Sequence, residues 1–294
     1  MPDTTITATP RGLDHLVIGV HDLDAAGAFY ETLGFTVGAR NRHPWGTENR
    51  IVQFPGSFLE LITIGDAAAV VPPAPRVFSF GSFVGEALAR GEGLSMLVLE
   101  STDAKADAAA FKASGIGDYE PFFFERQAKR PDGSEVRVAF SLAFAADSLA
   151  PECGFFVCQQ HEPQNFWNPA FQQHANGASA LSAAILVTDD PAAHRSFLRA
   201  YAGFPEVLEG NDDFVLTLPR GRIDVLDAET AQAIYHAQPE PTPARFLGFC
   251  VTVADLDALA TRLEAAKVSF GRGEERIVVP AEAAMGCVIA FEQA

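Results

Sequence analysis

The chain has 294 residues, of which 48% are hydrophobic and 20% charged, so its composition is that of a globular protein long enough for two domains. Its 38 acidic and 21 basic residues give a net charge of −17, which argues against nucleic acid and anionic membranes as partners. No apolar run approaches the ~20 residues of a transmembrane helix, and residues 1–10 lack the features of a secretory signal. We therefore expect a cytoplasmic monomer or homodimer whose partner is a small-molecule substrate.

The cysteine content points to the same compartment. The four cysteines are Cys153, Cys158, Cys250 and Cys287. They form no C-x-x-C pair and all lie in apolar, strand-like runs. This pattern predicts buried free thiols in a reducing environment.

One pattern recurs four times along the chain. It consists of an apolar run, an aspartate, an amphipathic stretch and three strand-like runs. The copies open at residues 13–20, 93–101, 180–188 and 245–253. VHDLDA (20–25) and VADLDA (253–258) agree at five of six positions, and residues 20–35 and 187–204 both end in Gly-Phe. Such self-similarity indicates a tandem repeat of one supersecondary unit.

Each copy predicts one helix followed by three strands. The helices begin after Asp22, Asp103, Asp189 or Asp190, and Asp255, and glycines end the first three at 34, 115 and 203. The strands are expected near 35–40, 47–54, 57–64, 121–128, 135–144, 154–161, 206–209, 213–218, 221–227, 268–271, 275–280 and 286–292. The Pro-, Gly- or amide-rich segments 72–75, 168–178 and 238–244 between copies predict turns.

Four βαβββ units in tandem resemble the vicinal oxygen chelate superfamily, which includes glyoxalase I, extradiol dioxygenases and bleomycin-resistance proteins. The most specific stretches are LDHLVIGVHDLDAAGAFYETLGF, GTENRIVQF and SFLELI, and they are most similar to the glyoxalase-like domain branch. The resemblance implies an α+β fold in which the four units pair into two half-open mixed β-barrels. We expect a disordered tail at 1–11, a first barrel at 12–167, a linker at 168–178 and a second barrel at 179–294.

The resemblance also implies metal ligands on the first and last strands of a unit. In the first copy these positions hold His15 and Glu60. Imidazole and carboxylate suit a borderline divalent cation such as Zn, Ni, Mn, Co or Fe(II). A satisfied half-buried histidine and an edge-strand carboxylate are the structural alternatives, in which case no metal is bound.

The second copy departs from this pattern. Ser95 or its neighbour matches His15, and the last-strand glutamate position falls near Cys158. Gln159 and His161 share one strand face, so either can turn inward and complete a metal site with His15 and Glu60.

The later copies depart further. Ser182 or Ala183 and Gly248 stand at the histidine position, and the fourth copy has no acid near Ile289. Asp224 matches Glu60, but one carboxylate does not make a metal site. Any functional cleft is therefore expected in the first barrel.

The segment HPWGTENR offers further groups for a cleft. His43, Trp45, Asn49 and Arg50 suit contacts to a small oxygen-rich substrate, although a hairpin loop with an exposed arginine explains the segment equally well. The aromatic, amide-rich segment 163–174 either covers the cleft mouth or packs between the barrels. FFFERQAKR (122–130) is expected to be a solvated strand edge, with anion binding as the alternative.

These observations support two functions. The first is a divalent-metal-dependent lyase or isomerase of the glyoxalase type, in which the metal chelates neighbouring oxygens of the substrate and Glu60 moves a proton. The alternative is a metal-free protein that binds or sequesters a small molecule, as bleomycin-resistance proteins do. An extradiol dioxygenase ranks last, because no barrel supplies two histidines and a glutamate in place. The sequence has no phosphate-binding loop, dinucleotide fingerprint, serine-hydrolase elbow or H-E-x-x-H motif.

Overall fold

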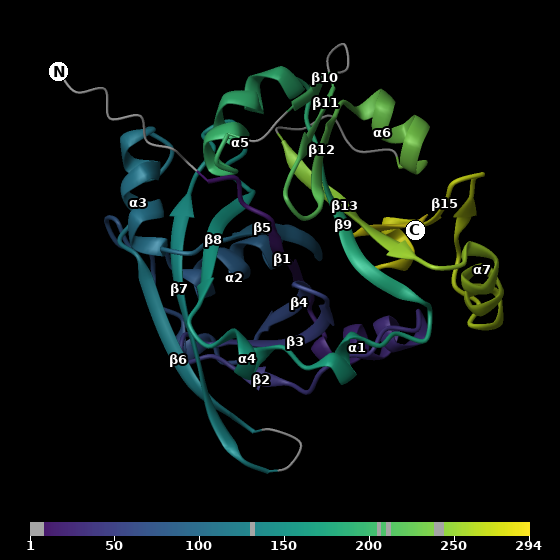
Figure 1. The fold of residues 1–294 in the computed structure, drawn as a ribbon, viewed down its shortest axis with the longest axis horizontal. Coiled ribbons are helices and arrows are strands. Elements are labelled where there is room, and N and C mark those ends of the chain that lie inside the picture. The colour runs from purple at the N-terminus through teal and green to yellow at the C-terminus, as the bar shows by residue number, and fades with distance from the viewer. Residues whose placement is uncertain (1–8, 130–132, 205–206, 210–212, 238–243) are drawn as a thin grey trace.

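Two eight-stranded mixed sheets form the framework of the protein. The computed structural model describes all residues except 1–8, 130–132, 205–206, 210–212 and 238–243. The strand orders are β2-β3-β4-β1-β5-β8-β7-β6 and β10-β11-β12-β9-β13-β16-β15-β14. Figure 1 shows the two curled sheets side by side, with β1 to β8 on the left and β9 to β16 at the upper right.

The first sheet contains units one and two. Its strands are β1 (Leu13–Gly19), β2 (Asn41–Arg42), β3 (Thr47–Phe54), β4 (Ser57–Ile64), β5 (Gly93–Glu100), β6 (Phe122–Lys129), β7 (Glu135–Ala145) and β8 (Gly154–Gln160). Its helices are α1 (Leu23–Thr32), α2 (Phe80–Arg90), α3 (Ala104–Ala113) and α4 (Pro163–Phe166). The strand β1 is parallel to β4 and antiparallel to β5, which in turn is parallel to β8.

The second sheet repeats this arrangement with units three and four. Its strands are β9 (Ala178–Val187), β10 (Val207–Glu209), β11 (Phe214–Thr217), β12 (Arg222–Leu226), β13 (Arg245–Val253), β14 (Gly271–Arg272), β15 (Arg276–Val279) and β16 (Val288–Gln293). Its helices are α5 (Arg195–Tyr201), α6 (Ala228–Tyr235) and α7 (Leu256–Ala265). The central strands β9 and β13 are antiparallel to each other. The α+β fold of four βαβββ units that pair into two half-open barrels is therefore confirmed.

Aspartate caps explain where the unit helices begin. The side chains of Asp22, Asp103 and Asp255 each accept two backbone N–H groups of the first turn of α1, α3 and α7. In unit three Asp190 caps a short 3-10 turn, Pro191–His194, which leads into α5. Each cap satisfies donors that the helix itself leaves unpaired.

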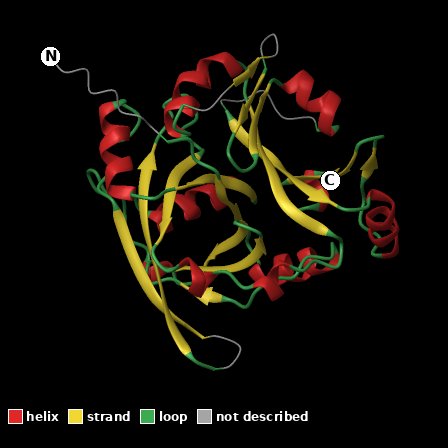
Figure 2. Ribbon diagram, viewed as in Figure 1, coloured by secondary structure: helices red, strands yellow, loops and turns green. Residues whose placement is uncertain are grey.

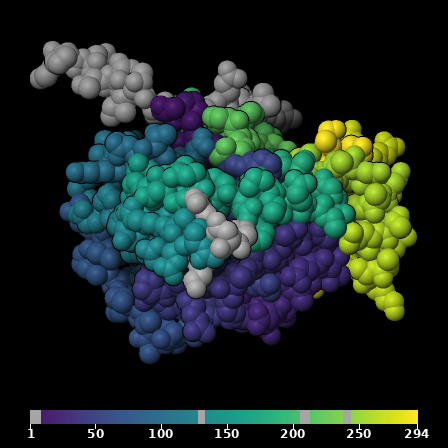
Figure 3. Space-filling view, turned by 60° about the horizontal axis from the view of Figure 1, so that its bottom comes forward, coloured from purple at the N-terminus to yellow at the C-terminus, as the bar shows by residue number. Residues whose placement is uncertain are grey.

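The four unit helices contribute side chains to one continuous hydrophobic core that both sheets share. One hydrophobic cluster includes Tyr30 of α1, Phe111 of α3, Tyr201 of α5 and Leu259 of α7, together with strand residues of both sheets. Figure 2 shows these helices against the sheets, and Figure 3 shows that the green-to-yellow half packs on the purple-to-teal half along a continuous surface. The two halves are therefore not independent bodies on a flexible tether.

Two helices that the sequence pattern does not predict cover the inner faces of the sheets. In the first barrel, α2 buries Phe80, Val84 and Leu88 against β-strand residues of the interior. In the second barrel, α6 buries Ala231 and Tyr235 in the equivalent place. Both helices connect one unit to the next, where the repeat pattern gives no guidance and Pro-rich stretches suggest turns.

The outer strands are shorter than expected. β2 and β14 contain only two residues each, where the sequence predicts strands near 35–40 and 268–271. β2 begins after the range 35–40, and β14 overlaps only the last residue of 268–271. In the described residues all four cysteines are free and buried, as predicted, and no helix is long and apolar enough to cross a membrane.

Residues 1–8 of the expected tail lie outside the described residues, whereas Arg11 and the expected linker form hydrogen bonds with the folded halves. Arg11, placed in the expected disordered tail, is buried and donates to Asp107 and to the carbonyl of Tyr201. In the expected linker, His174 bonds to the carbonyl of Gln53 at 2.8 Å and accepts from the N–H of Thr36. Backbone hydrogen bonding of these segments, which composition does not reveal, fixes them on the folded halves.

Two buried polar contacts join the halves. His194 of the second half lies 2.6 Å from Asp147 of the first half, and its other ring nitrogen lies 3.0 Å from Thr188. The hydroxyl of Tyr201 donates toward the carbonyls of Leu97 and Phe156, at 2.7 and 2.6 Å. Because these groups are buried, losing either partner leaves an unsatisfied polar atom.

Two buried tyrosines give a matched test of this packing. We expect Tyr201→Phe to lower the free energy of unfolding by about 1–3 kcal/mol, because two buried carbonyls lose their donor. Tyr30 is equally buried, but its hydroxyl has no partner among the described residues. Tyr30→Phe should therefore leave stability within about 0.5 kcal/mol of wild type or raise it. Urea denaturation measures both; equal losses in the two variants would contradict the arrangement.

Candidate functional site

An aromatic-walled cavity lies inside the first barrel. Its volume is about 50 Å³. Its walls are the rings of Phe58, Phe80, Phe124, Phe140, Phe156 and Phe166, with Trp45. Polar side chains of His15, His43, Asn49, Glu60 and Arg126 reach the same space. Few polar groups in an apolar enclosure are typical of small-molecule sites.

A break in strand register positions His15. The pairing of β1 with β5 shifts between Leu13 and His15, so Asp14 is an additional residue on the β1 side of the ladder. Its carboxylate lies 2.5 Å from Nδ1 of His15, and both side chains are buried. The His15 ring stacks on Phe58 at 4.2 Å between centroids. These contacts fix the ring and leave Nε2 facing Glu60, at 3.9 Å.

Glu60 is the central acceptor of the cavity. It lies on β4 opposite Ile51, with only 7% of its surface exposed. The Asn49 amide donates to its Oε1 at 2.5 Å. Asn49 also lies 3.4 Å from Nε2 of His43, whose Nδ1 is 2.8 Å from the hydroxyl of Thr47. The strand β3 thus supplies a polar ladder that holds the carboxylate in one orientation.

The charges of the cavity are partly balanced. Burial lowers the pKa of Arg126, and the attraction of Glu60 opposes that shift. Burial also lowers the pKa of His43, with a further lowering by Arg126 and an opposing effect of Glu60. The His43 imidazole is therefore neutral at pH 7. One carboxylate and one guanidinium face the same apolar space.

Trp45 carries a polar atom without a partner. Its indole ring stacks on His43, with centroids 4.6 Å apart, and packs edge-on against Phe124. Its Nε1–H group is buried and has no hydrogen-bond acceptor among the described residues. A buried donor of this kind costs free energy unless something accepts its hydrogen bond.

Five of the eight sequence-predicted site residues meet in this cavity: His15, His43, Trp45, Asn49 and Glu60. The other three point elsewhere because strand side chains alternate between faces. Arg50 lies between Asn49 and Ile51 on β3, donates to the Gly38 carbonyl at 2.9 Å, and pairs with Glu31 of α1.

Gln159 and His161 lie on the face of the sheet opposite the cavity. On β8 the cavity-lining residues are Phe156 and Cys158. Gln159 accepts from the N–H of Ala104 and donates to the Thr102 carbonyl, at the start of α3. His161 is exposed and lies 2.8 Å from the hydroxyl of Ser141. Neither side chain joins His15 and Glu60.

The strand registers identify the second-unit counterparts of His15 and Glu60. His15 pairs with Phe58, two positions before Glu60, and Met96 pairs with Gly154, two positions before Phe156. His15 precedes Asp22, the cap of α1, by the same number of residues as Met96 precedes Asp103, the cap of α3. The counterparts are thus Met96, the neighbour of Ser95 that the sequence allowed, and Phe156, two positions before the expected Cys158.

The donors present form only half of a metal site. Metal–ligand bonds of roughly 2.0–2.2 Å are short enough for one ion to bridge His15 and Glu60 after a small movement. A carboxylate on Nδ1, as Asp14 provides, is also the usual support of a metal-binding histidine. Cys158 also lines the cavity, and burial raises the pKa of its thiol well above the ordinary value. Outside the undescribed segments, no three His, Cys, Asp or Glu residues gather to hold a metal. The residues therefore do not fit a metal site with three protein ligands.

In the second barrel the carboxylate that matches Glu60, Asp224, is paired with other side chains. This carboxylate pairs with the Arg222 guanidinium at 2.9 Å and accepts from the Tyr235 hydroxyl at 3.0 Å. Arg222 also pairs with Glu292 at 2.8 Å. Asp224 is thus neutralised within the protein.

Sequence reasoning missed three contributors to the cavity. Arg126 alternates with Phe124 on one face of β6, a pattern visible in FFFERQAKR but assigned there to a solvated edge. Phe80 comes from the unexpected helix α2. Asp14 reaches His15 only because of the register shift, which the sequence does not signal.

Comparison with known proteins places the chain in a family. The model of the glyoxalase-like domain family matches residues 13–202. The chain belongs to the glyoxalase-like domain family. The vicinal oxygen chelate resemblance is thereby confirmed. No curated protein matches the sequence.

Solved structures share the fold at low sequence identity. A hypothetical protein from Staphylococcus aureus superimposes with a TM-score of 0.68 at 14% identity, covering 97% of this chain and 100% of its own. A catechol dioxygenase, BphC, gives 0.56 at 10% identity, covering 97% and 87%. A mutant 4-hydroxymandelate synthase from Streptomyces coelicolor gives 0.51 at 12% identity, covering 97% and 92%. At these identities the likeness concerns the fold alone.

The lowered pKa of His43 predicts a pH dependence of stability. Because the folded protein takes up the His43 proton at lower pH than the unfolded chain, stability is lost as pH falls through about 6.5. We expect the free energy of unfolding to fall between about pH 7.5 and 5.5, and His43→Asn to reduce that fall. His174 also has a pKa lowered by burial, so part of the slope will remain in the variant. Exposed His21→Asn is the control, and an unchanged slope in His43→Asn would argue against a neutral buried His43.

Proposed function

We propose that the first barrel binds a small aromatic molecule with a hydroxyl or carbonyl end, without a metal. The observation that carries this proposal is the convergence of Glu60, Arg126 and the unpartnered Trp45 N–H in one aromatic cavity. Glu60 accepts from a hydroxyl, while Arg126 and Trp45 donate to an oxygen. Phenylalanine rings on the walls suit a flat apolar body.

The size of the cavity limits the occupant. A cavity of roughly 150 Å³ holds benzene, so a space of about 50 Å³ admits a single ring only if the side chains move outward. In our proposal, Phe80 of α2 and Phe166 of α4 move outward to make that space. BphC, which shares the fold, is a catechol dioxygenase, and catechol is a ring of this size with two hydroxyl groups.

A metal-dependent lyase or isomerase is the second candidate. The contact of Asp14 with Nδ1 of His15 favours it, because that contact leaves Nε2 as a lone-pair donor facing Glu60. In this function His15 and Glu60 would hold the metal, which would supply Lewis-acid chemistry, and Glu60 could instead carry a proton. The two candidates differ in whether binding needs a metal.

Calorimetric titration with catechol and phenol distinguishes them. In metal-free protein we expect saturable binding, with Glu60→Gln weakening it at least about tenfold through loss of a charged acceptor. Asp224→Asn, the matched change in the second barrel, should leave it unchanged. Binding seen only after Zn²⁺, Mn²⁺, Ni²⁺, Co²⁺ or Fe²⁺ is added, and lost in His15→Ala, would move the assignment to the metal-dependent candidate. No binding under either condition, or full binding by Glu60→Gln, would overturn both.

A further inference from the structure

A second, larger cavity lies between the two barrels and is separate from the aromatic one. Its volume is about 540 Å³, within the usual range for ligand pockets. The end of α2 and the start of β5 form one wall. The start of β13, the end of α6 and the loop before β16 form the other. The cleft therefore contains residues of both halves.

Backbone contact between the halves fixes the width of this cleft. At its edge, a Cβ atom on Gly286 would lie 1.9 Å from the carbonyl oxygen of Glu92. A Cβ atom on Gly93 would likewise lie 3.0 Å from the carbonyl oxygen of Gly286. Two main chains can approach this closely only where no side chain intervenes. The two halves are thus in backbone contact at this edge of the cleft.

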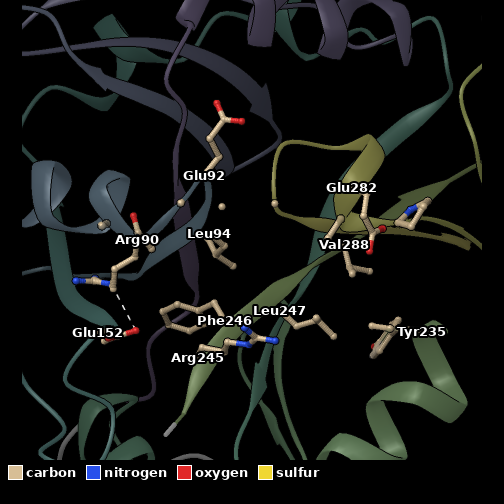
Figure 4. Close-up of a pocket in the computed structure, with 18 of the residues that line it drawn as sticks. Arg90, Glu92, Leu94, Glu152, Tyr235, Arg245, Phe246, Leu247, Glu282 and Val288 are labelled. Carbon is tan, nitrogen blue, oxygen red and sulfur yellow. Dashed lines mark ion pairs between the residues drawn. The ribbon is translucent and has the colours of Figure 1, made fainter. Parts of the chain in front are cut away.

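Most charges around the cleft are already matched. Arg90 pairs with Glu152 at 3.4 Å, as the dashed line in Figure 4 shows. Glu92 accepts from the N–H of His21 at 2.7 Å, and its carboxylate points away from the other labelled residues. The Tyr235 hydroxyl is bonded to Asp224, so only its ring faces the cleft.

Arg245 and Glu282 are the exceptions. Within the part of the chain that the structure describes, neither has an ion-pair or hydrogen-bond partner. Arg245 lies at the start of β13, and Glu282 lies in the 3-10 turn Ala281–Ala283. In Figure 4 the apolar side chains of Leu247 and Val288 lie between them. One positive and one negative group therefore stand apart across an apolar surface.

From this arrangement we propose that the cleft binds a zwitterion whose carboxylate and ammonium groups are separated by an apolar chain. The carboxylate pairs with Arg245, the ammonium pairs with Glu282, and the chain covers Leu247, Val288 and Phe246. An anion alone would leave Glu282 unmatched, and a cation alone would leave Arg245 unmatched. Arg245 is half-buried and Glu282 is exposed, so the pairing with Arg245 contributes more of the specificity.

Titration calorimetry with 6-aminohexanoate tests the proposal, with hexanoate and hexylamine as single-charge probes. We expect 6-aminohexanoate to bind at least about tenfold more tightly than either probe. Arg245→Gln should reduce its affinity to that of hexylamine, and Glu282→Gln should reduce it to that of hexanoate. Exposed Lys105→Gln, which also removes one positive charge, should change nothing.

Two further measurements keep the cleft distinct from the aromatic cavity. Both tryptophans of the chain, Trp45 and Trp167, belong to the first half, and Trp45 lines the aromatic cavity. Binding in the cleft should leave tryptophan fluorescence unchanged and should persist in Glu60→Gln. Absence of 6-aminohexanoate binding at about 10 mM, or equal affinity in wild type and both cleft variants, overturns the proposal. Circular dichroism confirms that each variant is folded.

Discussion

Burial on both faces of the central strands is the constraint on which the rest of the structure depends. On β1, Leu16 and Ile18 pack into the core that the two sheets share, while Val17 packs in the interior of the first barrel. Side chains alternate along a regular strand, so a residue's position decides whether it reaches the core or the cavity, except where a register shift such as that at Asp14 intervenes. A polar side chain on the inner face is costly without a partner, and His15, Asn49 and Glu60 are hydrogen-bonded to one another or to close neighbours.

The same constraint separates what the sequence could reveal from what it could not. Repeat spacing and aspartate caps locate the unit helices, and the first-unit motif locates His15 and Glu60. The sequence does not predict which residues of β8 face the cavity. Both faces of the run GFFVC are apolar, so the pattern does not show whether Gln159 or Gln160 turns inward. The register shift at Asp14 and the helix α2 depend on tertiary packing, so no local pattern announces them.

The two barrels stabilise a buried carboxylate with different partners. Both place an acidic side chain at the same point of the last strand of a unit, Glu60 in the first and Asp224 in the second. A buried carboxylate is costly unless it is paired. In the second barrel Arg222 lies between Asp224 and Glu292 and completes the pairing internally. In the first barrel an amide, Asn49, holds Glu60, which leaves acceptor capacity facing the cavity.

A ligand can therefore add hydrogen bonds or ion pairs where the protein leaves polar groups without enough partners of their own. A carboxylate that accepts only from neutral or distant donors is stabilised when a ligand adds another donor. This stabilisation is larger among phenylalanine rings, because charge interactions strengthen where water is excluded. The Asp224 carboxylate gains less, because it already pairs with Arg222 and accepts from the Tyr235 hydroxyl. The same reasoning holds for Arg245 and Glu282 in the cleft between the barrels. The charged groups near them have partners within the described residues, whereas these two do not. Repetition of one unit supplied four equivalent frameworks, and the placement of a few charges made them chemically different.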